Sequence, residues 1–261
     1  MKNNYHTHMY LCRHAVGDVE DYVIVAINLG FKSLGMSDHA PFEELEDRSI
    51  RMHPTDLKTY LAQCDACIKK YATKIKIFKA LEIEYFPSHK QMYETLLTQL
   101  DYLALGQHYI KDESAPNNLR STYTLQTKEH IITYVDTVVE AMKTKNFRFV
   151  CHPDLMLYNI KKFDEFISKQ SRRIIEAAIE CDIPLEINVN GIRKGLRETE
   201  DGLRYLYPRL EFWKLVKQMG AKVIISSDAH QPSHLYNAEV IKAYEFATQL
   251  QIEVEEEISI N

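Results

Sequence analysis

Glycine is scarce in this sequence, at 8 of 261 residues. No Gly-x-Gly-x-x-Gly or P-loop pattern occurs, which argues against a nucleotide bound on a glycine-rich loop. No apolar run approaches the roughly 18 residues of a membrane-spanning helix, and the N-terminal MKNNYHTHMY lacks the apolar stretch of a secretory signal. Positive charge is not in excess either, because the formal net charge is −5. We therefore expect neither a membrane nor a nucleic acid as partner.

Cysteines are few and odd in number, at five, which fits a reduced cytoplasm. None is followed six residues later by arginine, so a cysteine-nucleophile phosphatase has no candidate here. Cys64-x-x-Cys67 lies in a predicted helix without a second pair, which favours core or surface thiols. Cys151 precedes His152, and alternation along a strand would point it to the opposite face. We therefore count neither Cys151 nor Cys12 as a metal ligand.

Short apolar runs alternate with longer amphipathic ones along the whole chain. After a short N-terminal strand running into His6, we expect strands at Phe31–Met36, Ile75–Ile83, Tyr102–Gly106, Phe147–Cys151, Pro184–Val189 and Lys222–Ser226. We expect helices at about Asp18–Leu29, Pro54–Tyr71, Ser88–Gln99, Lys128–Lys145, Asp164–Cys181, Pro208–Met219 and Leu235–Leu250. The polar stretch from Lys111 to Thr124 reads as a loop. Seven βα units with no linker predict one α/β domain with a closed or nearly closed barrel, with an open doubly wound sheet as the alternative.

Histidines gather where these strands end. Seven of the eleven follow a predicted strand: His6, His8, His14, His39, His108, His152 and His230. Glu82 and Asp228 occupy equivalent places, whereas the remaining four histidines lie on helices or connecting loops. The C-terminal ends of barrel strands converge on one mouth, so these side chains would share a pocket. Imidazole and carboxylate together suit Zn, Fe or Mn, and two or three ions are plausible.

The ordered motifs resemble the polymerase-and-histidinol-phosphatase (PHP) family. They are H-T-H at 6–8, C-R-H at 12–14, S-D-H at 37–39, A-L-E-I-E-Y at 80–85, G-Q-H at 106–108, C-H-P-D at 151–154 and S-S-D-A-H at 226–230. The resemblance implies a distorted (β/α)7 TIM-like barrel with three metal ions. It implies three ligand sets: His6, His8, Glu82 and Asp228; then Glu82, His108 and His152; then His14, His39 and His230. The family motif places the ligand at Glu82 rather than Glu84, although Ala80 stands where glycine is common.

Within the family, Glu186–Leu196 is most similar to the histidinol-phosphate phosphatases. The resemblance implies hydrolysis of L-histidinol phosphate, a small phosphate monoester, by a metal-bridging hydroxide. Arg193 is the expected phosphate clamp because a guanidinium group matches two phosphate oxygens, and Arg197 and Arg13 are further candidates. The proton donor to the leaving alkoxide could be Asp228, His230 or a metal-bound water. Glu43, Glu44 and Glu46 are candidates for binding the amino alcohol. A nuclease and a non-catalytic metal-binding domain are the alternatives, and the sequence does not indicate an oligomeric state.

Overall fold

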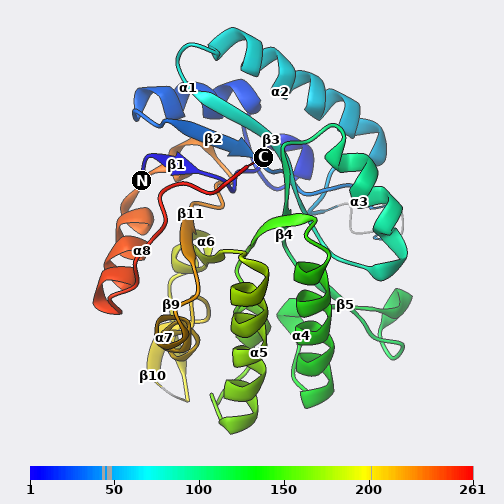
Figure 1. Ribbon diagram of the computed structural model, residues 1–261, viewed down its shortest axis with the longest axis vertical. Helices are drawn as coiled ribbons and strands as arrows, with labels where there is room; N and C mark the ends of the chain where they lie inside the picture. The colour runs from blue at the N-terminus through cyan, green and yellow to red at the C-terminus, as the bar shows by residue number, and fades with distance from the viewer. Residues whose placement is uncertain (43–44, 46–48, 201, 261) are drawn as a thin grey trace.

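A parallel sheet forms the centre of the molecule (Figure 1). The structure, a computed structural model, describes residues 1–42, 45, 49–200 and 202–260. Within this part, seven strands follow one another in the order β1 (Asn3–Asn4), β2 (Ser33–Met36), β3 (Lys76–Ile83), β4 (Tyr102–Leu105), β7 (Phe147–Val150), β8 (Leu185–Asn188) and β11 (Val223–Ser226). Every neighbouring pair is parallel. A parallel bridge between Thr7 and Ala229 joins the two edges, so the sheet is a nearly closed barrel.

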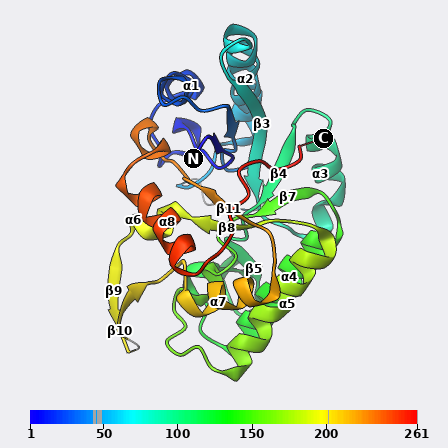
Figure 2. The same ribbon diagram turned by 60° about the vertical axis from the view of Figure 1, so that its left-hand side comes forward.

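Helices surround this barrel on its outside, as Figures 1 and 2 show. They are α1 (Val19–Asn28), α2 (Leu57–Tyr71), α3 (Lys90–Leu97), α4 (Lys128–Lys143), α5 (Glu165–Cys181), α6 (Val189–Arg193), α7 (Leu210–Met219) and α8 (Ala238–Gln249). Local signals set several of their ends: Asp18 forms a capping box with Asp21 at the start of α1, and Gly220 ends α7 with a φ of 77°. The predicted (β/α)7 architecture is confirmed.

Two antiparallel hairpins and several 3-10 turns complete the described chain. The hairpins are β5 (Tyr109–Lys111) with β6 (Leu119–Ser121), and β9 (Leu196–Thr199) with β10 (Gly202–Tyr205). The 3-10 segments are Tyr10–Cys12, Pro54–Asp56, Pro87–His89, Pro116–Asn118, Thr122–Thr124, Leu155–Leu157 and Pro232–Leu235. The predicted loop over 111–124 therefore contains a three-residue strand. Strands this short carry too little alternation to be recognised from the sequence.

The hydrophobic core has two parts because side chains alternate along each strand. Ile77, Leu81 and Ile83 on β3 belong to the large cluster that includes helix residues. Phe78 and Ala80 on the same strand belong to a second cluster with Tyr5, Tyr102, Ala104, Phe149, Cys151 and Ile224. Ile258 and Ile260 near the C-terminus pack against this second cluster. The alternation that directs Phe78 and Ala80 to one face carries Glu82 to that face as well.

Among the described residues, no helix combines the length and the apolar character needed to cross a membrane.

Candidate metal centre

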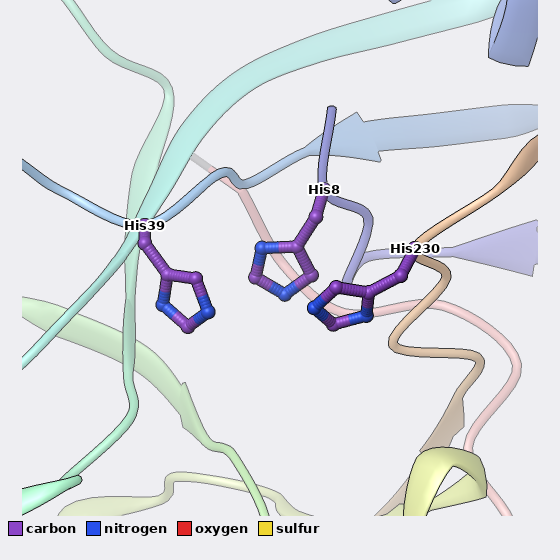
Figure 3. A group of neighbouring side chains, drawn as sticks. All are labelled: His8, His39 and His230. Atoms are coloured by element: carbon purple, nitrogen blue, oxygen red, sulfur yellow. The ribbon is translucent and has the colours of Figure 1, made fainter. Parts of the chain in front are cut away.

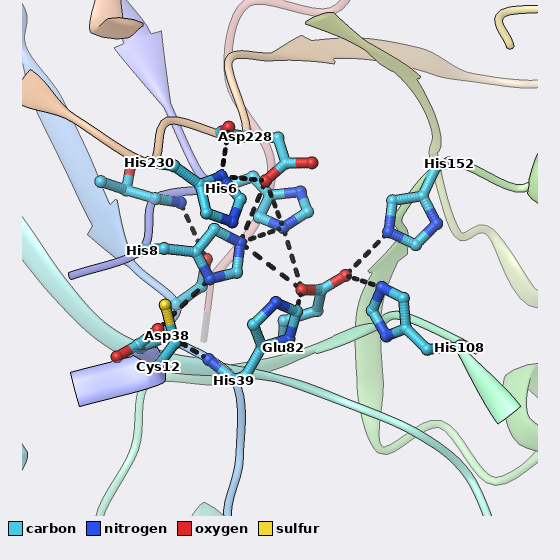
Figure 4. A network of polar contacts seen from close by, with 12 residues as sticks. His6, His8, Cys12, Asp38, His39, Glu82, His108, His152, Asp228 and His230 are labelled. Carbon is cyan, nitrogen blue, oxygen red and sulfur yellow. Dashed lines mark hydrogen bonds and ion pairs between the residues drawn. The ribbon is translucent and has the colours of Figure 1, made fainter. Parts of the chain in front are cut away.

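The structure brings all nine predicted ligand residues to one end of the barrel, and Figure 4 labels eight of them, all except His14. They lie on, or follow, six of the seven strands of the sheet. His6 and His8 come after β1, His39 after β2, His108 after β4 and His152 after β7. Glu82 lies on β3, and Asp228 with His230 follows β11. His14 lies beyond the turn after β1, with its ring centroid 4.5 Å from that of His230. The remaining histidines have partners outside this group, namely Thr55, Ser88, Asp112 and Gln231.

Glu82 is the central side chain of the group. Its Oε1 lies 2.8 Å from Nε2 of His152 and 3.5 Å from Nε2 of His108. Its Oε2 lies 3.0 Å from Nδ1 of His39, 3.3 Å from Nε2 of His6 and 3.5 Å from Nε2 of His8. The carboxylate therefore lies between two groups of imidazoles. A carboxylate with both oxygens surrounded in this way can contact more than one cation.

Several donor atoms are paired in a way that protein hydrogen bonds alone do not explain. Nε2 of His6 lies 3.1 Å from Nε2 of His8, and Nε2 of His14 lies 2.8 Å from Nε2 of His230. Nδ1 of each of these four rings faces an oxygen acceptor, so in the neutral rings the proton lies on Nδ1 and both Nε2 atoms of a pair present lone pairs. Asp228 Oδ1 lies 3.0 Å from Nε2 of His8, yet it is buried without a properly oriented hydrogen bond. Such converging lone pairs fit divalent cations.

Three small ligand groups stand out within the centre. His8, His39 and His230 can each direct one nitrogen to a common point (Figure 3). His6, His8 and Asp228, three members of the first predicted set, form another such group. His108 and His152, which the second predicted set combines with Glu82, both lie near Glu82 Oε1. For the third set, His14 and His230 lie together, whereas His39 lies closer to His8.

Electrostatics favour ionised carboxylates in this centre. Burial alone would raise the pKa of Glu82 and of Asp228, but the surrounding histidines hold both pKa values well below the usual range. Burial lowers the pKa of His230 to about 3, so this ring is neutral. Burial also opposes protonation of His8, yet the adjacent carboxylates of Asp228 and Asp38 raise its pKa to about 9. Metal loading would displace protons from such rings and become weaker in acid.

A cavity of about 380 Å³ opens above these ligands. Ligand residues form much of its wall. Its other lining residues in the described part of the chain are Ile50, Tyr123, Asn190 and Lys194. The volume is within the range of pockets for small molecules.

Comparison with known proteins matches these residues to a family. The PHP domain profile covers residues 4–190 of this chain. The chain belongs to the PHP domain family. The match ends before Asp228 and His230, so the structure rather than the profile joins these two residues to the other ligands.

Two curated relatives of this PHP domain are named probable histidinol-phosphatase. The protein from Schizosaccharomyces pombe is 25% identical over 92% of this chain and 84% of its own length. The protein from Deinococcus radiodurans is 24% identical, over 88% of this chain and 86% of its own length. A solved structure of histidinol phosphate phosphatase from Lactococcus lactis, complexed with Zn, L-histidinol and phosphate, matches with a TM-score of 0.72. It is 17% identical and covers 97% of this chain and 95% of that one, so the likeness concerns the fold.

Carboxylates outside the nine ligands hold the rings of this PHP domain in place. Glu186 Oε1 lies 2.8 Å from Nδ1 of His6, so Nε2 of that ring faces the centre. Asp38 Oδ1 lies 3.3 Å from Nδ1 of His8. Glu84 Oε1 lies 3.3 Å from Nδ1 of His108, and Glu84 also accepts hydrogen bonds from both terminal nitrogens of Arg51. Glu82 therefore faces five histidines, while Glu84 contacts one of them; Glu82 stays the predicted ligand.

Glu186 and Asn188 are site residues that the sequence analysis did not identify. Both lie on β8, two residues apart, and Asn188 Nδ2 donates to Glu186 Oε2 at 2.8 Å and to Asp228 Oδ2 at 3.1 Å. The backbone N–H of His152 also donates to Glu186 Oε2. The available signal was two polar residues at alternate positions of an otherwise apolar strand.

We expect Glu186→Gln to weaken metal binding about 10- to 100-fold, because an outer carboxylate that orients a ligand ring typically contributes this much. The glutamine retains the size but loses the charge and turns one acceptor into a donor. Titration against a chelator of known affinity measures the effect. Glu176→Gln, on the exposed side of α5, is the matched control. Equal affinities of the two variants would contradict a positioning role for Glu186.

Cys151 is not directed away from the site, in contrast to the sequence-based expectation. Its sulfur lies close enough to donor atoms of His6 and Glu82 to form a potential ligand group with them. The expectation assumed an extended backbone at His152, but His152 has a φ of 32°. This turn lets two consecutive side chains face the barrel interior. Cys12 likewise lies near His14 and His230.

The predicted substrate arginines do not line the cavity. Arg193 donates from NH2 to the carbonyl oxygen of Ser227 at 3.2 Å and from NH1 to Asn190 Oδ1 at 3.1 Å. Arg197 is exposed on β9. Arg13 is also exposed and lies 3.3 Å from Asp56. The phosphate-clamp role of Arg193 stays a prediction, and the structure places Lys194 in the cavity instead. Glu43, Glu44 and Glu46 lie outside the described residues.

Proposed function

We propose that this chain is a metal-dependent phosphomonoesterase that hydrolyses L-histidinol phosphate to L-histidinol and phosphate, a reaction of histidine biosynthesis. The observation that carries the proposal is the cluster of nine His, Glu and Asp side chains at one end of the barrel, in which Glu82 contacts five of the histidines. The curated relatives named probable histidinol-phosphatase support the choice of substrate. The Lactococcus lactis structure, with L-histidinol and phosphate bound, supports it further.

Three divalent ions, of Zn, Mn or Fe, would be held by the nine ligands in the sets predicted above. His8 would also be a ligand in the third set, because one of its nitrogens lies near nitrogens of His39 and His230. Ions in such a site supply Lewis-acid polarisation of the phosphoryl group and lower the pKa of a bound water. The Zn of the Lactococcus lactis structure supports a divalent ion, and the converging buried donors of this chain fit one.

The chain's own groups would orient this centre and handle protons. Glu186, Asp38 and Glu84 each engage the Nδ1 of one histidine, which leaves its Nε2 directed to the centre. Arg193 holds the loop that carries Asp228 through the carbonyl oxygen of Ser227. Asp228 and His230 are the side-chain candidates for the proton donor to the leaving alkoxide. His230 Nδ1 lies 3.1 Å from the backbone carbonyl oxygen of Asp228 and 3.4 Å from its Oδ1, so the two candidates are adjacent.

The substrate is a small molecule, and the cavity of about 380 Å³ suits one. The acidic residues suggested for its amino group, Glu43, Glu44 and Glu46, remain candidates. All five cysteines are free and four are buried, which supports the proposal of a reduced, cytoplasmic location.

Substrate preference tests the proposal. We expect kcat/KM for L-histidinol phosphate to exceed that for p-nitrophenyl phosphate about 100-fold or more, equivalent to roughly 2.7 kcal/mol. Both are measured in one buffer, with Mn²⁺ and then with Zn²⁺. Comparable values would support phosphoesterase activity but would contradict L-histidinol phosphate as the preferred substrate. No turnover of either ester by the metal-loaded protein would contradict the proposed function as a whole.

A further inference from the structure

Lys194 has an unusual position at the mouth of the cavity. It follows α6 directly, and it lines the cavity together with Asn190 of that helix. Its Nζ lies 4.6 Å from the ring centroid of Tyr123, 5.5 Å from that of Tyr207 and 5.9 Å from that of Tyr158. We call these three rings the tyrosine cluster. Nζ also donates to Tyr123 Oη at 3.4 Å.

Among the described residues this ammonium group forms no ion pair at contact distance, although the charge of Asp228 acts on it from further away. Its contacts there are the aromatic faces and one phenol oxygen. Aromatic faces attract a cation but leave its charge uncompensated. Burial by its neighbours lowers the pKa of Lys194, and the charge of Asp228 opposes this shift only in part. Arg193, one residue earlier, has its terminal nitrogens engaged by carbonyl oxygens.

The remainder of the cavity wall indicates what Lys194 would bind. Besides the ligand residues, the described lining consists of Ile50, Tyr123, Asn190 and Lys194. Of the described residues that line the cavity, only Lys194 is a lysine or arginine. A molecule in this cavity lies between Lys194 and the metal-ligating side chains. In a phosphate monoester, the group that an ammonium cation such as Lys194 would bind is the dianionic phosphoryl group. We propose that Lys194 binds a phosphoryl oxygen of the substrate; this inference rests on the proposed function.

The tyrosine cluster would hold Lys194 ready for this contact. Tyr207 is 1% exposed, and the rings of Tyr123 and Tyr158 pack edge to face with centroids 5.0 Å apart. A free lysine side chain loses up to about 2 kcal/mol of conformational entropy when it is ordered. Contacts to three rings impose part of that order before the substrate arrives, so less of it is lost on binding.

Three variants test the contact. Lys194→Met removes the charge and retains the alkyl chain, and Lys194→Arg retains the charge. Lys128→Met is the matched control, because Lys128 Nζ lies 5.2 Å over the ring of Phe166 on a different part of the surface. Calorimetry measures the binding of inorganic phosphate to each metal-loaded protein. Inhibition of p-nitrophenyl phosphate hydrolysis measures the affinity for inorganic phosphate and, separately, the affinity for L-histidinol. Metal content is determined for each sample.

We expect Lys194→Met to weaken phosphate binding about 10- to 100-fold, the range for a hydrogen bond to a charged group. L-Histidinol inhibition and metal content should stay within about twofold of the parent protein, Lys194→Arg should recover most of the affinity, and Lys128→Met should change none of these values. Unchanged phosphate affinity in Lys194→Met would overturn the inference, as would an equal loss for L-histidinol. Absence of phosphate binding to the parent protein would also overturn it. Failure of the proposed substrate is seen separately, in the preference of the parent protein for L-histidinol phosphate.

Discussion

Glu82→Gln should remove most of the metal and lower kcat/KM by about a thousandfold or more. Glu82 lies within 3.5 Å of nitrogens of five histidines, and no other carboxylate of the described chain contacts so many of them. The substitution keeps the volume of the side chain and removes its negative charge. One glutamine position becomes an N–H₂ group, which cannot bind a cation and faces imidazole nitrogens. Metal content by mass spectrometry and kcat/KM for the phosphate ester are the measurements.

The fold of Glu82→Gln should persist, because the change removes no apolar contact from the core. Thermal unfolding of the metal-free proteins separates this from the loss of metal, since bound metal would itself stabilise the parent protein. Glu176→Gln on α5 serves again as the control and should keep full metal content and activity. A Glu82→Gln protein with normal metal content and full activity would contradict the placement of Glu82 at the centre.

Much of this centre could be predicted from the sequence because barrel geometry ties chemistry to position. Residues just beyond parallel strands meet at one end of the sheet, so a histidine after each strand is informative even when each motif alone is weak. His6, His39, His108 and His152 come from four different strands, and all have a nitrogen within 3.5 Å of Glu82. Local patterns also predicted the strands and longer helices, since their apolar periodicity is strong.

The residues that sequence reasoning missed depend on contacts between distant segments. Glu186 contacts His6 across 180 positions of the chain, and nothing in its own strand names that partner. Lys194 and Arg193 are neighbours of similar charge, and the course of the chain after α6 decides which lines the cavity. Cys151 was misplaced because the positive φ of His152 interrupts strand alternation. Neither a glycine nor a recognisable turn motif marks this backbone conformation in the sequence.

Gly106→Ala should disrupt the same centre by steric overlap, without changing its charge. Gly106 follows β4, and its backbone N–H donates to the carbonyl oxygen of Ile83 on the neighbouring strand. A Cβ at this position would lie 2.1 Å from Oε1 of Glu82 and 2.5 Å from its Cγ and Cδ. These distances are too short for any real Cβ contact, so either Glu82 or the strand must shift. Glu82 has little freedom to move, because His152 and His39 lie within 3.0 Å of its two oxygens.

The expected result is a loss of about 1–3 kcal/mol in the free energy of unfolding of the metal-free protein, the range for overpacking a dense interior. A displacement of Glu82 by about 1 Å should lower kcat/KM about a hundredfold or more. Denaturant unfolding, metal content and kcat/KM measure the three effects. Gly220→Ala is the control for stability alone: its φ of 77° strains an alanine while nothing lies near the added Cβ, so metal binding should stay normal. Glu82→Asp in the Gly106→Ala background shortens the opposing side chain, and the two changes should then cost less stability together than the sum of each alone. Additive losses would show that the alanine acts elsewhere than on Glu82.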